Sequence, residues 1–465
     1  MRVRLGEDDT IAAISTAVGE GGIGIVRLSG RQAITIAEKV IKPKEGAGLK
    51  ERRSHSIFLA NVVDPESGLE IDEVLVTIMR APNTYTREDV VEINCHGGVV
   101  SLKKTLNSVL HAGARAADPG EFTKRAFLNG RIDLAQAEAV IETIRAKTEA
   151  GLRAAINQLE GGLSKNIKSV AEKIADVLTQ VEAAVDFSDE DIETLPSKAL
   201  SEMLFQSERE LEALLSTSVR GRMIREGIRT AIVGKPNVGK SSLLNALLRR
   251  ERAIVTPIPG TTRDVIEEVI NLGGVPLRLI DTAGIRESED EIESIGLELT
   301  RRAIKEAELI LLVVDGSQDQ DSEDLSLVGE IAGTSAILVV NKQDLPQSKS
   351  IDRFALNRNF KAVVRVSALT GYGIKELEKK IEETFFAGDI EAEDTAIITN
   401  ARHEQLVEKA LDNIREAKRL IDINQPEEIV AVFLQEALDN LGEITGETIG
   451  EDVLGRIFSQ FCIGK

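Results

Sequence analysis

The chain has 465 residues, of which 42% are hydrophobic and 29% are charged, and its formal net charge is −20. This composition is typical of a soluble globular protein of about three domains, and the negative charge argues against indiscriminate binding to polyanions, which needs clustered Lys and Arg. Two cysteines are too few for a disulfide framework or a four-ligand zinc site, and without a long apolar run or a signal-peptide core we expect a cytoplasmic protein with no membrane anchor.

The first segment, residues 1–130, has the pattern of a mixed α+β domain. Short apolar strands are expected at 23–28, 74–78 and 90–93. The glycine-rich residues 19–24 precede a strand, whereas a dinucleotide-binding turn would join a strand to a helix. The sequence therefore offers no flavin-binding motif of its own.

Helical periodicity follows this segment. Apolar residues repeat at alternating steps of four and three, which predicts the buried seam of a long amphipathic helix in a bundle and not a free-standing coiled coil. The seam consists of Leu163, Ile167, Val170, Ile174, Val177, Val181 and Ala184. Helical periodicity returns after residue 399. Since the ends of an inserted domain usually lie close together, we expect one helical domain in two parts, 131–226 and 391–465, interrupted by a domain at 227–390.

The interrupting domain alternates apolar strands with helical stretches, which predicts a doubly wound, mainly parallel sheet. The expected strands are 230–233, 277–280, 309–314, 336–340 and 362–366. The overall expectation is a multidomain protein of α/β and α+β class, with the α/β domain inserted into an α-helical domain.

A phosphate-binding loop follows the first of these strands. Residues 234–241 read Gly-Lys-Pro-Asn-Val-Gly-Lys-Ser, and an apolar helix begins directly afterwards. This is the P-loop pattern in its strand-loop-helix context. Backbone N–H groups turn inward on the phosphates, Lys240 would reach the β- and γ-phosphates, and Ser241 would ligate Mg²⁺.

Further motifs follow in the order of a GTPase. Residues 281–284 would place a carboxylate beside Mg²⁺ and a glycine N–H near the γ-phosphate. Residues 260–264 are a candidate switch loop in which Thr262 would complete the Mg²⁺ shell. Asp344 can accept two N–H donors from guanine that adenine does not offer, which selects GTP over ATP. The predicted GTP-binding residues are Asn237, Val238, Gly239, Lys240, Ser241, Ser242, Thr256, Pro257, Ile258, Pro259, Gly260, Thr261, Thr262, Asp281, Thr282, Ala283, Gly284, Asn341, Lys342, Gln343, Asp344, Ser367, Ala368 and Leu369.

One expected catalytic part is missing from this set. Ile285 follows the 281–284 motif, where many GTPases carry a Gln that orients the attacking water. Acids further along, or arginines that offer charge to the transition state, are the alternatives. These candidates are Glu287, Glu289, Asp290, Glu291, Glu293, Arg263 and Arg286.

The chain also contains the runs 24–30, 96–98, 119–123 and 126–129 and the C-terminal run 455–465. With these motifs it resembles the MnmE/TrmE family of tRNA-modification GTPases over nearly its whole length. The resemblance implies a folate-binding, dimerising N-terminal domain and a GTPase domain inserted into a helical one. It implies a homodimer that joins the flavoprotein MnmG, also called GidA, in a heterotetramer. Together they would add an aminomethyl-type group to C5 of the wobble uridine of certain tRNAs, with 5-formyl- or methylene-tetrahydrofolate as the one-carbon source.

The resemblance also assigns residues. Asn237 would coordinate K⁺ with backbone of Thr256, Ile258 and Thr261, while Lys240 and Glu293 would act in hydrolysis, Glu293 by orienting the water. The folate contacts would be Arg27, Glu92, Lys465 and Arg131, the last standing where a Lys is common. Cys462 would provide a thiol at the modification site, although a small buried hydrophobic residue is the alternative for a free cysteine.

The residues leave a second class of function open, a ribosome- or RNA-assembly GTPase switch without modification chemistry. Wobble uridines that lack their C5 substituent in cells deleted for the gene would favour the first reading, and normal nucleosides with abnormal ribosome profiles would favour the second.

Overall fold

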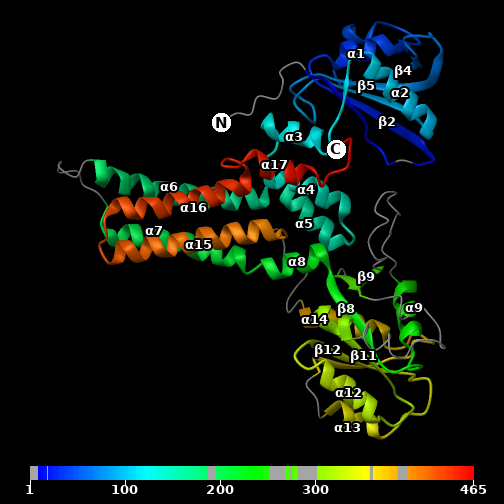
Figure 1. The fold of residues 1–465 in the computed structure, drawn as a ribbon, viewed down its shortest axis with the longest axis vertical. Helices are drawn as coiled ribbons and strands as arrows, with labels where there is room; N and C mark the ends of the chain where they lie inside the picture. Colours follow the sequence, from blue (N-terminus) through cyan, green and yellow to red (C-terminus); the bar gives the residue numbers. More distant parts are fainter. Residues whose placement is uncertain are drawn as a thin grey trace. The chain divides into compact units, whose positions relative to one another are not determined.

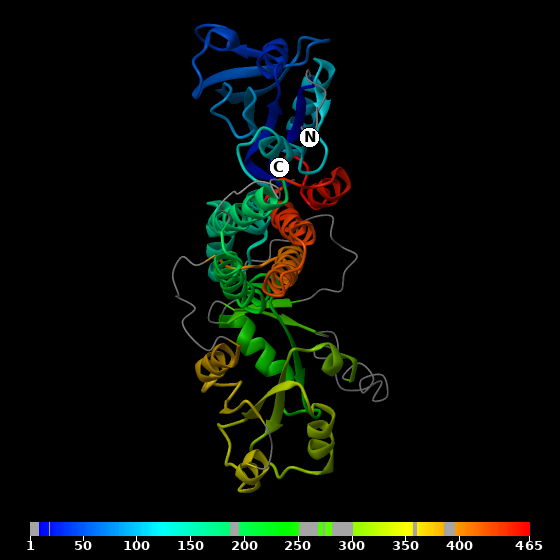
Figure 2. The same ribbon diagram turned by 90° about the vertical axis from the view of Figure 1, so that its left-hand side faces the viewer.

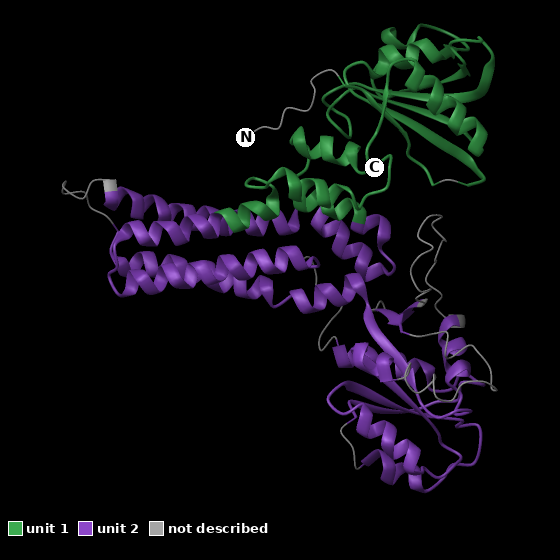
Figure 3. Ribbon diagram, in the orientation of Figure 1, with its two compact units in different colours: residues 1–141, 439–465 green, residues 142–438 purple. Residues whose placement is uncertain are grey.

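The computed structural model describes residues 9–17, 19–186, 195–250, 268–272, 275–280, 301–356, 360–385 and 396–465. The chain forms two compact units, residues 1–141 with 439–465 and residues 142–438 (Figure 3). The unit boundaries fall within α4 (Leu134–Arg145) and α16 (Glu427–Thr445). None of the helices in the described ranges is both long and apolar enough to cross a membrane.

The first unit is built on a seven-stranded sheet of order β3-β4-β5-β6-β2-β1-β7, in which only the β1–β7 pair is parallel. The strands are β1 (Ile11–Ile14), β2 (Gly21–Ser29), β3 (Ile41–Pro43), β4 (Ser56–Val63), β5 (Glu70–Met79), β6 (Val90–Gly97) and β7 (Arg115–Ala116). The three strands expected from the sequence lie within β2, β5 and β6 and are confirmed.

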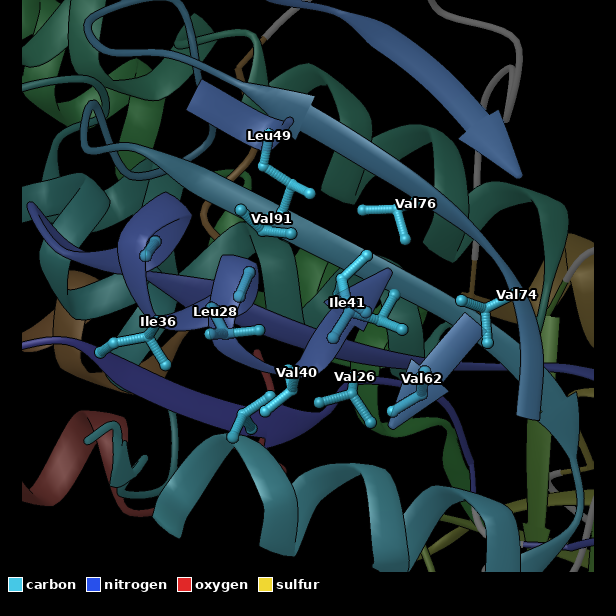
Figure 4. Packing of buried hydrophobic residues seen from close by; sticks show 14 of the residues in the cluster. Val26, Leu28, Ile36, Val40, Ile41, Leu49, Val62, Val74, Val76 and Val91 are labelled. Atoms are coloured by element: carbon cyan, nitrogen blue, oxygen red, sulfur yellow. The ribbon is translucent and has the colours of Figure 1, made fainter. Parts of the chain in front are cut away.

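One face of this sheet packs against α1 (Ala33–Val40) and α2 (Val99–His111), with the short η1 (Leu49–Glu51) at its edge. Side chains alternate along each strand, so that Val74 and Val76 of β5 are buried while Leu75 between them is exposed. Figure 4 shows β-branched and Leu side chains from the strands and helices interdigitating in this core. The sheet thus has one covered face and one face with exposed apolar residues.

The C-terminal segment belongs to the same unit. Helix α17 (Glu451–Phe458) packs with α3 (Glu121–Leu128) and the start of α4 around Phe458 and Phe461. Gly120 has φ +68°, and a Cβ there would lie 2.8 Å from the Phe458 carbonyl oxygen. Glycine at this position therefore lets the C-terminal segment approach the start of α3.

The second unit begins with a helical bundle. Its helices are α5 (Glu149–Leu159), α6 (Gly162–Asp186), α7 (Ser197–Leu215), α8 (Ser218–Glu226) and α15 (Ala401–Asp422). Helix α7 packs against both α6 and α15, as Figures 1 and 2 show. The predicted seam of α6 is confirmed, since its Leu, Ile and Val members are all buried.

The rest of this unit is a six-stranded sheet of order β13-β12-β11-β8-β10-β9, parallel except for the β9–β10 hairpin. Its strands are β8 (Ile228–Val233), β9 (Glu268–Leu272), β10 (Val275–Leu279), β11 (Leu309–Asp315), β12 (Ser335–Asn341) and β13 (Ala362–Arg365). Its helices are α9 (Lys240–Arg250), α12 (Ser322–Glu330), α13 (Ser350–Leu356) and α14 (Ile374–Phe385). Separate apolar clusters cover the two faces, with α9 and α14 on one and α13 on the other. The doubly wound, mainly parallel sheet is confirmed.

The chain enters and leaves this sheet at one place in the bundle. It leaves α8 at Gly227, and it returns through residues 396–400, where Ile398 N–H donates to Thr217 Oγ1 at 3.1 Å. The Thr399 hydroxyl donates to Glu142 Oε2 at 3.0 Å, and Arg225 of α8 pairs with the same carboxylate at 3.3 Å. The α/β domain is therefore an insertion between two parts of the helical bundle, as the sequence predicts.

The contact between α8 and the returning chain gives a stability prediction. A Cβ on Gly221 would overlap the carbonyl group of Ile398, so Gly221→Ala should lower the free energy of unfolding by about 1–3 kcal/mol despite the better helix propensity of Ala. Gly329→Ala in α12 is the matched control because no atom lies within 4 Å of its Cβ, and it should raise stability by about 0.5–1 kcal/mol. Urea unfolding followed by far-UV circular dichroism measures both, and equal changes would contradict the prediction.

Candidate functional site

The P-loop joins β8 to α9 by a path that only glycine permits at two positions. Gly234 has φ +157° and Gly239 has φ +98°. A Cβ at Gly234 would overlap the carbonyl of Val313 in β11, and one at Gly239 would overlap the side-chain amide of Asn341. The loop is therefore held close to the carboxyl ends of β11 and β12, where ligands of parallel sheets bind.

Lys240, at the start of α9, folds its side chain back over the loop. Its ammonium group donates to the carbonyl oxygens of Gly234 at 2.9 Å and Lys235 at 2.8 Å. Burial lowers the pKa of Lys240, and a phosphate ligand would favour the charged form again. Asn237 lies at the loop tip in the left-handed region, with φ +60°, and Ser241 and Ser242 of α9 are exposed. This arrangement fits a triphosphate bound at the N-terminus of α9.

A second lysine anchors the loop. The Lys235 ammonium lies 2.7 Å from Asp321 and 2.8 Å from Asp324. The two acids also form the capping box of α12, so a single pair of carboxylates fixes both the loop and the helix start. Burial opposes the charge of Lys235, but the two carboxylates prevail and raise its pKa.

Asn341 connects three of the predicted motifs. Its side chain is buried, donates from Nδ2 to Val238 O of the P-loop at 2.8 Å, and accepts from Ala368 N–H at 3.0 Å. The Ser367 hydroxyl donates to Asp344 Oδ1 at 2.5 Å. The P-loop and the two predicted guanine loops thus meet around one amide.

Lys342, next to Asn341, also has a left-handed backbone, with φ +63°, and its ammonium lies 2.7 Å from Asp315 at the end of β11. Burial raises the pKa of Asp315, but hydrogen bonds from Lys342 and Ser317 outweigh it and lower the pKa overall. Sequence reasoning missed Asp315 and the acids that hold Lys235. An acid directly after a buried strand was the available signal for Asp315.

Two predicted GTP-binding residues, Gln343 and Leu369, form no hydrogen bond to the P-loop or to Asn341 among the described residues. The Gln343 side chain donates to Gln347 at 2.5 Å, and Leu369 is 83% exposed. The predicted residues 256–262 and 281–284 and the catalytic candidate Glu293 lie outside the described residues.

In the first unit the structure brings Arg27 and Glu92 together. They face each other in register on β2 and β6, and Arg27 Nε and Nη2 both lie 2.8 Å from Glu92 Oε1. The Arg27 guanidinium also lies 5.7 Å from the centre of the Phe122 ring and 3.5 Å from the carbonyl oxygen of Gly464. The pair therefore sits against the C-terminal residues.

The C-terminal residues are held by the start of α3. Gly120 N–H donates to Cys462 O at 3.4 Å, and Phe122 N–H donates to Lys465 O at 3.2 Å. Gly464 has φ +93°, and a Cβ there would meet the backbone of Ile14 in β1. The backbone N–H groups of Gly120 and Phe122, together with the close approach of Gly464 to Ile14, hold the C-terminal segment near Arg27.

The two cysteines differ sharply. Cys95 is buried in β6, and burial raises the pKa of its thiol to about 11. Cys462 is exposed. The Arg131 guanidinium lies 4.7 Å from the centre of the Tyr85 ring, and no hydrogen bond or ion pair among the described residues joins it to Arg27 or Glu92.

Residues 134–462 match the family model described as MnmE helical domain, and residues 10–131 match that of GTP-binding protein TrmE N-terminus. The chain is 49% identical to the tRNA modification GTPase MnmE of Alkaliphilus metalliredigens (strain QYMF), over 98% of this chain and 99% of that relative. It is 51% identical to that of Geobacillus thermodenitrificans (strain NG80-2), over 99% of this chain and 100% of the relative. Among solved structures, a variant of Aquifex aeolicus Era bound to GDP.AlF4- is 28% identical, with a TM-score of 0.27, covering 40% of this chain and 67% of that chain.

The position of Asn341 predicts that its amide organises the nucleotide site. Asn341→Ala would leave Val238 O and Ala368 N–H without their partner, so GTP affinity should fall by roughly tenfold or more, the scale of an unsatisfied buried polar group. Titration with a fluorescent GTP analogue measures the change. Asn94→Ala is the control, because it removes a similar amide-to-carbonyl bond, 2.9 Å to Leu75 O, from the other unit. Unchanged affinity in Asn341→Ala would remove it from the site.

Proposed function

The chain belongs to the MnmE family of tRNA modification GTPases, and we propose that it couples GTP hydrolysis to the addition of an aminomethyl-type group at C5 of the wobble uridine of certain tRNAs. A reduced folate, 5-formyl- or methylene-tetrahydrofolate, would supply the carbon, and the flavoprotein MnmG would be the partner. The observation that supports the proposal is the contact of the Arg27–Glu92 pair with the C-terminal segment, which also carries Lys465 and the exposed Cys462.

For the nucleotide, we assign guanine selection to Asp344 and phosphate binding to the P-loop. A carboxylate accepts the paired N–H donors of guanine, and the Ser367 hydroxyl orients it from 2.5 Å. Lys240 would move from the two loop carbonyls to the β- and γ-phosphates. Mg²⁺, held by Ser241 and Thr262, would neutralise charge between these phosphates.

The catalytic assignments follow from the family. Asn237 would hold K⁺ at the loop tip together with backbone of Thr256, Ile258 and Thr261, and K⁺ would stabilise negative charge where other GTPases use an arginine. Glu293 would orient the attacking water in place of the absent Gln. The left-handed backbone of Asn237, which turns the loop tip sharply, is the described feature that supports its special role.

For the folate, the geometry of Glu92 suggests how the ring is held. Both Arg27 nitrogens approach Oε1, so Oε2 is the oxygen that would accept donors from the aminopyrimidine ring. Arg27 holds the carboxylate in position through these two contacts. Lys465, brought to the same cluster by its backbone bond to Phe122, would offer a cation to the ligand.

We further propose that the protein acts in the cytoplasm as a homodimer and forms a heterotetramer with the flavoprotein. An exposed apolar part of the second face of the first sheet, on β4 and β5, supports dimerisation. Ile57, Leu59 and Leu75 are 62%, 44% and 44% exposed, and Leu59 and Leu75 face each other in register on β4 and β5. Such a contiguous apolar patch is typical of a surface that a second copy covers.

The role of Cys462 gives the test of the whole proposal. In cells that lack the chromosomal gene, Cys462→Ala should fail to restore the modified wobble nucleoside, because the exposed thiol at the folate cluster is lost, while purified protein keeps its GTP hydrolysis rate. Cys95→Ala is the matched control, since that thiol is buried and stays protonated. Nucleoside mass spectrometry of total tRNA reads out both. Normal wobble nucleosides in the deleted cells themselves would contradict the proposal and favour an RNA-assembly switch.

Folate binding itself is tested by Glu92→Gln. The change removes the charge that accepts the ring donors, so calorimetry of the full-length protein with 5-formyltetrahydrofolate should show roughly tenfold weaker binding or more, the scale of one hydrogen bond to a charged group. Glu73→Gln is the control, because Glu73 makes a comparable ion pair, 3.0 Å to Lys44, on the neighbouring strand β5. If the unaltered protein binds no reduced folate, the folate site is refuted.

A further inference from the structure

A cavity in the first unit is lined by cationic side chains. It has a volume of about 460 Å³, and His55, Arg87 and Arg131 line it together with Tyr85. The chain as a whole has a net charge of −20, so a cavity lined by cations and, among the described residues, by no carboxylate is unusual for this protein. Within the described ranges no carboxylate lines the cavity or pairs with Arg87 or Arg131.

Each of the two arginines is held in place by a backbone carbonyl group. Arg87 Nη1 donates to Asn129 O at 2.9 Å, and Arg131 Nη1 donates to Tyr85 O at 3.3 Å while its guanidinium stacks on the Tyr85 ring. A guanidinium has five N–H donors, and each of these two hydrogen bonds uses one. Both side chains are therefore oriented in advance and keep donors for an anion.

The acids next to Arg87 in the sequence are turned to other partners. Glu88 accepts from Ser29 at 2.7 Å and pairs with Arg125 at 3.2 Å. Asp89 accepts the Ala81 N–H at 3.0 Å. In addition, His55 and Arg87 adopt left-handed backbone conformations, with φ of +58° and +60°, which residues other than Gly rarely adopt and which cluster at functional sites. Arg87 and Arg131 therefore line the cavity, while the neighbouring carboxylates of Glu88 and Asp89 bind other partners.

The cavity adjoins the predicted folate cluster through one turn of α3. Tyr85, the wall of the cavity, bonds to the Thr123 hydroxyl at 2.9 Å and packs against a cluster that contains Phe122. Arg27 lies 5.7 Å from the centre of the Phe122 ring, and Met79, which lines the cavity, is two residues along β5 from Thr77, the register partner of Glu92. A ligand whose ring contacts Glu92 could therefore extend an anionic end toward Tyr85.

We propose that this cavity binds the glutamate chain of a polyglutamylated reduced folate, with Arg87 and Arg131 each contacting a carboxylate. The proposal rests on the folate site proposed above. Each added glutamate contributes one carboxylate, and exposed guanidinium–carboxylate pairs are worth about a factor of three each in affinity. The protein would then prefer the polyglutamylated form of its one-carbon donor.

Calorimetry of the full-length protein with mono- and triglutamyl 5-formyltetrahydrofolate tests this. The triglutamyl form should bind roughly tenfold more tightly at low salt, and the difference should shrink at high salt because exposed charges are screened. Arg87→Gln should reduce the difference to about threefold and leave monoglutamate affinity unchanged. Lys104→Gln, which removes an exposed cation of α2 outside the cavity, should preserve the full difference.

The outcomes separate the two proposals. Equal affinity of the unaltered protein for both ligands, or a difference that Arg87→Gln does not reduce, overturns the glutamate-chain site and leaves the folate site intact. Failure to bind either ligand refutes the folate site and this inference with it. Weaker tRNA binding by Arg87→Gln with an unchanged difference between the folates would show that the cavity contacts RNA phosphates, and it too overturns the proposal.

Discussion

The buried polar contact around Thr399 is the constraint on which the second unit depends. An inserted domain is positioned only if the chain that enters it and the chain that leaves it are held at the same place, and here Glu142 binds both, through Thr399 on the returning chain and Arg225 on α8. Glu142 is only 9% exposed, and a buried carboxylate without its partners is strongly destabilising. Loss of either partner would therefore loosen both connections at once. The β9–β10 hairpin approaches the same place, because Gly227 lies against the backbone of Pro276.

This arrangement links nucleotide chemistry to the bundle by short steps. Strand β10 leads in sequence to the predicted switch residues 281–284. Helix α8 packs against β10, and Arg225 of α8 forms the ion pair with Glu142. Ile224 of α8 and Ala150 of α5 are part of the apolar core of the six-stranded sheet. A movement at the end of β10 would therefore reach packed helices directly, which is the kind of contiguous element through which coupling travels.

The apolar pattern of the sequence predicted the buried strands and the long amphipathic helix, because their packing follows that pattern. The apolar runs of β11 and β12 are buried on both sides and have helices on both faces, so their pattern and spacing were sufficient. The strands β1, β3, β4, β7 and β9 were missed. In β4 the apolar–polar alternation is broken by exposed apolar residues such as Ile57 and Leu59, and the other four strands are short. The P-loop and the guanine loops were found through motif and context. The contacts of Lys235 with Asp321 and Asp324, and of the C-terminal residues with α3, join positions far apart in the chain, and no local pattern specifies such partners.

The contrast between the two cysteines has a practical consequence for spectroscopy. Cys95 is enclosed between β6 and α2 with a thiol that stays protonated at neutral pH, whereas Cys462 is open to solvent. A maleimide dye added to the native, unaltered chain should therefore attach at a single place. Cys462 lies in the C-terminal segment that binds the start of α3 and contacts Arg27. The emission of the attached dye should therefore respond when a ligand binds to or leaves this region, and no reporter residue has to be engineered into the protein.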